Sequence, residues 1–222
     1  KHEVMLHCQR GCQRQMVGGN DFADAVITRS VSSDEHIGQL KVSILGIVRV
    51  FQWLHLARAA QAARDIVGEK SFRSEGLVMA HGTGTPQNRT TESAIMSTVA
   101  QALGIDDWRV AAVKGHTGHS LGAAAGDQLS ALLGIWESQW IPGIGTIPSL
   151  APDVHTDRLS FLLDNTPTDR CTYSLVNSKG FGGNNATATV LSPDSSHAVL
   201  KGLHGARAIE AWRERHERTQ KE

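Results

Sequence analysis

The chain has 222 residues, of which 40% are hydrophobic, and its 22 Lys and Arg balance 22 Asp and Glu. This is an ordinary composition for a globular protein and excludes a chain that is disordered throughout. The lack of net positive charge argues against a nucleic-acid partner, because such binding depends on a basic surface that releases counterions. The length predicts one domain.

Residues 1–32 show no readable pattern and stay unassigned. The three cysteines, Cys8, Cys12 and Cys171, are odd in number and unevenly spaced, which predicts free thiols, a reducing compartment and a cytoplasmic protein. Because Cys8 and Cys12 lack the spacing of paired zinc ligands, we expect no metal site. We expect no signal peptide either, because polar residues interrupt any apolar stretch near the start.

The most apolar stretch, Val42 to Ala63, predicts a long buried helix that begins near Asp34 and ends by Gly68. A polar residue interrupts this stretch at every third position: Arg49, Gln52, His55 and Arg58. The stretch therefore lacks the roughly 18 uninterrupted apolar residues that a membrane span needs. We expect no membrane-spanning helix.

Short apolar runs alternate with helical segments along the rest of the chain. We predict strands at residues 76–80, 110–113, 159–163, 173–177 and 186–191. Helices are predicted at 92–103 and 120–136, with a turn at 85–88 and a loop at 142–152. Pro193 is expected to close the ordered pattern. Residues 209–222 are predicted to be a charged segment that is solvated and partly helical, with a partner-binding helix as the alternative. This alternation predicts a layered α/β fold.

Three segments combine reactive side chains with glycines, and each lies beside a predicted strand. They read HGTGTP at 81–86, KGHTGHS at 114–120 and NSKGFGGNN at 177–185. None has the spacing of a dinucleotide-binding or Walker loop, which argues against nucleotide binding. A single histidine at a strand end is more often structural than catalytic, so each segment alone leaves both interpretations open.

Taken together and in this order, the three segments resemble the C-terminal half of the β-ketoacyl-[acyl-carrier-protein] synthases, the thiolase-like condensing enzymes. The resemblance extends over residues 33–191 and leaves 192–222 as the charged tail. It implies a thiolase-like layered α/β fold of which this chain supplies one mixed sheet covered by helices. That half would be incomplete without the N-terminal half of the synthase, and the family implies a homodimer.

The implied activity is an acyl transfer in fatty-acid or polyketide synthesis. A malonyl group on acyl carrier protein loses carbon dioxide, and the resulting enolate attacks an acyl thioester on an enzyme cysteine. The resemblance implies acyl carrier protein as partner, with both substrates carried on its phosphopantetheine, and no further cofactor.

The resemblance also implies roles for individual residues. His81 and His119 would be the catalytic pair that donates hydrogen bonds to the thioester oxygen, and their presence matches the Cys-His-His elongating type. Lys114 would pair with Glu92, hold the histidine loop and help to keep the imidazoles neutral. Further positions carried over are the oxyanion-hole segment Gly180, Phe181 and Gly182, and the supporting residues Thr83, Thr85 and Asn177.

Three departures from the family accompany these matches. Lys179 stands where elongating synthases have an aromatic gate residue, and Arg89 replaces a frequent aspartate. Only 80 residues precede His81, and neither Cys8 nor Cys12 has the small neighbours of the family's nucleophile. We therefore expect the nucleophilic cysteine outside this chain. A non-catalytic partner subunit like a chain-length factor, or a truncated inactive fragment, is the alternative.

Overall fold

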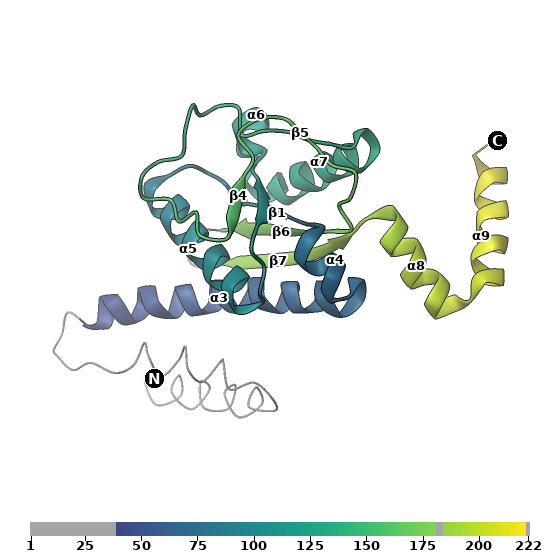
Figure 1. Cartoon of the computed structure of the whole chain (residues 1–222), viewed down its shortest axis with the longest axis horizontal. Coiled ribbons are helices and arrows are strands. Elements are labelled where there is room, and N and C mark those ends of the chain that lie inside the picture. Colours follow the sequence, from purple (N-terminus) through teal and green to yellow (C-terminus); the bar gives the residue numbers. More distant parts are fainter. Residues whose placement is uncertain (1–38, 181–183, 221–222) are drawn as a thin grey trace, which may run out of the picture. The chain divides into compact units, whose positions relative to one another are not determined.

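A mixed five-stranded sheet forms the centre of the structure (Figure 1). The computed structural model describes residues 39–180 and 184–220. The strands are β1 (Gly76–Met79), β2 (Trp108–Ala111), β4 (Leu159–Phe161), β6 (Tyr173–Lys179) and β7 (Asn185–Leu191). They lie in the order β4-β2-β1-β6-β7, with the first four parallel and β7 antiparallel to β6. The predicted α/β fold is confirmed.

Helices lie in the connections from β1 to β2 and from β2 to β4, whereas the connection from β4 to β6, which the structure describes throughout, contains no helix. The first part contains α3 (Gln39–Val67), α4 (Glu69–Ser74), α5 (Pro86–Ala102) and the short α6 (Lys114–Thr117). The second part contains the 3-10 turn η1 (Leu121–Ala123), α7 (Ala124–Ser138), α8 (Pro193–His204) and α9 (Ala206–Thr219). A separate two-stranded sheet pairs β3 (Trp140–Ile141) with β5 (Thr166–Pro167). Residues from Val48 onward form one compact unit.

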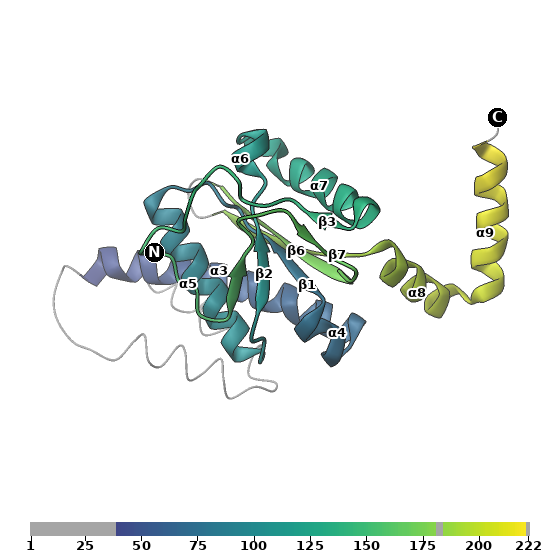
Figure 2. The same cartoon turned by 45° about the horizontal axis from the view of Figure 1, so that its top comes forward.

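The two faces of the sheet are covered by different helices (Figure 2). On one face, α3, α4 and α5 bury Leu56, Phe72 and Val99 against the strands. On the other face, α7 buries Leu132 and Ile135. Since successive strand residues point to opposite faces, one strand contributes side chains to the hydrophobic core on each face of the sheet.

Two proline positions correct the predicted boundaries. Pro86 begins α5, so the turn expected at residues 85–88 is wrong and the helix starts six residues earlier than predicted. Pro193 begins α8, so it does not close the ordered pattern. In both cases proline occupies the first helical turn, where its missing N–H has no intrahelical partner to lose. Ser192 caps α8 by accepting a hydrogen bond from the backbone N–H of Ser195.

The charged segment predicted to be partly helical lies mostly in α9, which begins at Ala206 and ends at Thr219. Its Trp212 stacks on His216, and neither α8 nor α9 contains a buried residue.

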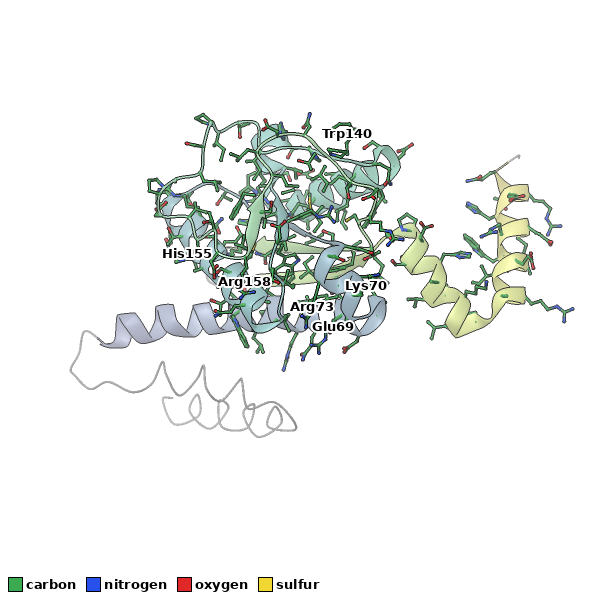
Figure 3. The ribbon with its side chains drawn as sticks, in the orientation of Figure 1. Glu69, Lys70, Arg73, Trp140, His155 and Arg158 are labelled. Atoms are coloured by element: carbon green, nitrogen blue, oxygen red, sulfur yellow. The ribbon has the colours of Figure 1, made fainter. Side chains whose placement is uncertain are left out.

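Surface ion pairs of the kind seen on α4, where Arg73 contacts Glu69, contribute little to stability (Figure 3). Within the described ranges, no helix has the length and apolarity to cross a membrane.

The start of β1 requires a residue without a side chain. Tyr173 packs over Gly76, donates a 2.8 Å hydrogen bond to the carbonyl oxygen of Phe72 and stacks on the Phe72 ring with centroids 5.5 Å apart. A Cβ atom at Gly76 would overlap the hydroxyl and ring of Tyr173.

We predict that Gly76→Ala lowers the free energy of unfolding by about 1–3 kcal/mol, because the Tyr173 ring must shift within a packed core. Urea denaturation measures the change. The control is Gly134→Ala, at an exposed α7 position where a Cβ would meet nothing within 4 Å. That variant should gain roughly 0.5–1 kcal/mol from helix propensity. Equal effects of the two substitutions would contradict the packing argument.

Candidate active site

The three glycine-containing motifs meet at one edge of the sheet. Strands β1, β2 and β6 are parallel neighbours, so their carboxyl ends lie side by side. Residue 81 follows β1, residue 114 follows β2 and residue 180 follows β6. The chain runs from β1 outward to β2 and β4 before it returns to β6 on the other side of β1. His81 therefore lies at the switch point, where open α/β sheets place their ligands.

The two histidines lie in contact distance of each other. Their ring centroids are 5.3 Å apart and the rings meet edge to face at 85°. His81 is 5% exposed, whereas His119 is on the exposed side of the site. One imidazole is therefore fixed in the protein and the other faces outward.

Backbone amides select the same tautomer in both rings. The Lys179 N–H donates to His81 Nδ1 at 3.2 Å, and the Leu121 N–H donates to His119 Nδ1 at 3.3 Å. Leu121 adopts a left-handed φ of 57°, which is uncommon for a leucine. A neutral imidazole that accepts at Nδ1 carries its hydrogen on Nε2. Both rings therefore present an Nε2–H donor.

The carboxylate of Glu92 anchors the loop that carries His81. Glu92 lies on α5, is 3% exposed, and accepts hydrogen bonds from the backbone N–H groups of His81 at 2.8 Å and Gly82 at 3.0 Å. The side-chain amides of Asn88 and Asn177 donate to it at 3.0 and 2.5 Å. Asn177 thus joins β6 to α5 next to the loop that carries His81.

Lys114 does not form the expected ion pair with Glu92. Lys114 begins α6 and is 8% exposed, and among the described residues its Nζ atom has no hydrogen-bond partner. The reason is that four N–H donors already occupy the Glu92 carboxylate. Burial lowers the pKa of Lys114, and the charges of Glu92 and Asp127 oppose that shift. Lys114 therefore acts on the site through its charge at a distance.

These surroundings favour the neutral form of His81. Burial lowers its pKa from 6.5 to about 4, and the positive charge of Lys114 adds to the effect. Glu92 acts in the opposite direction, while His119 and Lys179 lower the pKa further. The His81 ring is therefore uncharged near neutral pH.

The remaining sequence-predicted positions lie around this cluster. Thr83 is half-buried in the loop after β1, and Thr85 is the N-cap of α5, where its side chain makes no capping hydrogen bond. The backbone N–H of Gly180 donates to the carbonyl oxygen of Asn184 at 2.6 Å. Phe181 and Gly182 fall outside the described residues, and so do Cys8 and Cys12.

The two unusual residues have different surroundings. Arg89 makes a two-pronged ion pair with Asp153, with nitrogen–oxygen distances of 2.8 and 3.0 Å, and that contact lowers the pKa of Asp153. Arg89 therefore forms an ion pair at the surface of α5. Lys179 is half-buried, with a pKa lowered by burial, and lines a small pocket together with Glu92 and Asn177.

Gln128 on α7 was not singled out from the sequence. It is fully buried, and its Nε2 atom donates to the carbonyl oxygens of Met79, Ala80 and Asn177. The only signal in the sequence was a long polar side chain on a helix otherwise expected to pack closely. His116 on α6 contacts the carbonyl oxygen of Gly143 at 2.8 Å.

Cys171 is not placed to act as the nucleophile. The register Gly76↔Tyr173 sets it beside the start of β1, whereas His81 follows the end of that strand. Four strand residues separate the two ends by roughly 13 Å. The thiol is buried, which raises its pKa and disfavours the thiolate. Among residues 39–180 and 184–220, no three His, Cys, Asp or Glu side chains gather in a way that could hold a metal.

The fold matches one class of proteins. Residues 46–146 match the β-ketoacyl synthase C-terminal domain. The structure is similar to the crystal structure of the Pseudomonas aeruginosa ketosynthase FabY, with a TM-score of 0.72 at 45% identity over 76% of this chain and 26% of FabY. The chain thus carries a β-ketoacyl synthase C-terminal domain.

Curated relatives agree with that assignment. Beta-ketoacyl-[acyl-carrier-protein] synthase FabY of P. aeruginosa is 45% identical over 171 residues, which are 75% of this chain and 26% of the relative. The 3-oxoacyl-[acyl-carrier-protein] synthase 2 of Staphylococcus aureus is 36% identical over 59% of this chain and 31% of the relative. The oxazolomycin ketosynthase domain OzmH KS7 of Streptomyces albus, 22% identical with a TM-score of 0.56 over 65% of this chain and 26% of its own, shares the fold. The chain spans between about a quarter and a third of these relatives.

We predict that Glu92→Gln lowers the free energy of unfolding by about 1–3 kcal/mol, because the new amide N–H₂ would face two of the four N–H donors. Urea denaturation at pH 7 measures the loss. Glu137→Gln, an exposed change on α7, is the matched control and should stay within roughly 0.5 kcal/mol of the parent. A Glu92 variant as stable as the control would mean that the carboxylate is dispensable.

We also predict a pH dependence of stability that traces to His81. Its pKa is about 4 in the folded chain and near 6.5 when unfolded, so below pH 6.5 the unfolded state binds the extra proton first. The contribution of neutral His81 to the free energy of unfolding is full above pH 6.5, declines as the pH falls from 6.5 to 4, and levels off below pH 4. Denaturation at a series of pH values, compared with His81→Asn, isolates it; an unchanged pH profile in the variant would contradict the assignment.

Proposed function

We propose that this chain supplies the two catalytic histidines of a β-ketoacyl-[acyl-carrier-protein] synthase of the Cys-His-His elongating type. The observation that carries the proposal is the pair of imidazoles 5.3 Å apart, each accepting a backbone N–H at Nδ1. Two Nε2–H donors side by side suit a single oxygen on which negative charge develops. The matches to synthases support the same assignment.

In the proposed reaction, a malonyl thioester on acyl carrier protein binds with its thioester oxygen facing His81 and His119. The carbon–carboxylate bond breaks, carbon dioxide leaves, and the electron pair moves into the thioester to give an enolate. Both Nε2–H groups hydrogen-bond the enolate oxygen. The enolate carbon then attacks the carbonyl of an acyl group held on a cysteine, and the cysteine thiolate leaves.

The charges around His81 suit this role. A neutral imidazole can donate through Nε2 and still accept at Nδ1, whereas a protonated ring would lose the contact with the Lys179 N–H. Burial and the charges of Lys114 and Lys179 hold the His81 pKa near 4, which keeps that arrangement at neutral pH. Lys114 thus contributes without touching the substrate.

The condensation step needs a cysteine that the described residues do not supply at this edge of the sheet. The outer side of α7 and η1 carries the exposed side chains of Leu121, Leu129 and Leu133. We propose that further synthase sequence, which also contributes the nucleophile, covers these residues. The relatives, of which the chain spans 26% and 31%, have ample length for that part.

We predict that His81→Ala and His119→Ala each lower the rate of malonyl-carrier-protein decarboxylation at least about 100-fold, because each removes a donor to the enolate oxygen. The assay measures carbon dioxide release by the complete polypeptide that carries these residues. His155→Ala, an exposed histidine on the loop before β4, should leave the rate unchanged (Figure 3). Lys114→Ala should lower the rate as well.

Equal rates in the parent, His81→Ala and His119→Ala would refute the proposed roles. A folded parent with no decarboxylation at all would instead favour a non-catalytic partner subunit. Retention of full activity in Lys114→Ala would remove only the role given to the lysine.

A further inference from the structure

We propose that Gln128 is a positioning residue: its amide group holds the carboxyl ends of β1 and β6 together, and so keeps the Lys179 N–H on His81 Nδ1. The Nε2 atom donates to Ala80 O at 2.9 Å, Met79 O at 3.0 Å and Asn177 O at 3.3 Å. The activity readout below depends on the proposed synthase function, whereas the spectroscopic readout does not.

These contacts lie where the strand pairing stops. The β1–β6 ladder ends with Met79 opposite Val176. The next residues are Ala80, which follows the end of β1, and Asn177 on β6, and the amide of Gln128 joins them. A buried carbonyl oxygen that lost its donor would bear the full cost of desolvation, so the contact fixes the separation of the strands at this point.

The chemistry of the three acceptors also determines the orientation of the amide. An amide oxygen facing three carbonyl oxygens would be repelled by all of them, so only the N–H₂ group can face the strands. An apolar side chain could fill the same volume but would join neither strand. The contact therefore depends on the amide and not merely on packing.

Both strand ends lead directly to the histidine contact. His81 follows Ala80, and Lys179 lies two residues beyond Asn177. The 3.2 Å hydrogen bond from the Lys179 N–H to His81 Nδ1 therefore joins the same two chain segments that Gln128 joins at Ala80 and Asn177. A shift of either strand end would lengthen that bond and move the Lys179 ammonium away from the ring.

The same helix offers a matched control at the opposite end of the sheet. Trp136 donates from its indole nitrogen to the carbonyl oxygen of Cys171 at 2.8 Å, just before β6 begins. Trp136→Phe removes an α7-to-sheet hydrogen bond of the same kind, far from His81. A general loosening of α7 would follow from either substitution, but a change at His81 should follow only from the loss of Gln128.

The test compares Gln128→Met with Trp136→Phe in the complete polypeptide. Long-range ¹H–¹⁵N NMR of ¹⁵N-histidine-labelled protein follows the tautomer and pKa of His81. With Gln128→Met we expect the pKa to rise by about one unit, since both the Nδ1 hydrogen bond and the lysine charge disfavour protonation. We expect kcat for malonyl decarboxylation to fall about tenfold with little change in KM. Trp136→Phe should change neither.

Similar His81 spectra in the parent and Gln128→Met, or equal effects of the two substitutions, would overturn the inference. If Gln128→Met does not fold, Gln128→Asn provides the same comparison, because its shorter amide cannot reach both strands. A parent without decarboxylation whose His81 signal still responds to Gln128→Met would refute the proposed function and leave the positioning role standing. If the parent catalyses decarboxylation but Gln128→Met leaves the His81 signal unchanged, the positioning role is refuted and the proposed function stands.

Discussion

The buried carboxylate of Glu92 determines where the rest of the site can lie. An ionised acid that is 3% exposed is costly unless its oxygens accept hydrogen bonds, and the four donors around Glu92 meet that need. Two of the donors are the backbone N–H groups of His81 and Gly82 and a third is Asn177 on β6. One side chain of α5 therefore fixes the loop after β1 against the neighbouring strand.

The same geometry decides which group near the switch point stays uncharged. With its oxygens occupied by N–H donors, Glu92 leaves the Lys114 ammonium without a direct partner among the described residues. Lys179 brings a second ammonium into the same region and lines a pocket with Glu92. Burial of the His81 ring disfavours its charged form first of all, and two cations beside one anion add to that effect, so this ring gives up its proton most readily. The low pKa of His81 thus follows from the arrangement as a whole.

Most of the fold could be predicted from the sequence, because short apolar runs and their spacing record the strands of a covered sheet. Two of the boundary errors share a cause: proline at residues 86 and 193 is typical of a turn and of the first turn of a helix alike, so only the packing of the residues that follow decides between them. The resemblance of the three motifs to the synthases singled out His81, His119 and Asn177. It could not show that Glu92 binds backbone amides in place of Lys114, nor that Gln128 binds three carbonyl oxygens, because such contacts depend on distances between separate elements.

The departures at Lys179 and Arg89 are compatible with an intact histidine pair because the decisive contacts come from the main chain. The Lys179 backbone N–H donates to His81 Nδ1, and any residue except proline would supply that donor, so this hydrogen bond does not depend on the Lys179 side chain. Arg89 engages Asp153 on the surface of α5 and leaves the Glu92 carboxylate to its own donors. His119 likewise depends on the backbone of Leu121. Sequence variation at these positions therefore alters the charge around the imidazoles, while the orientation of both rings is retained.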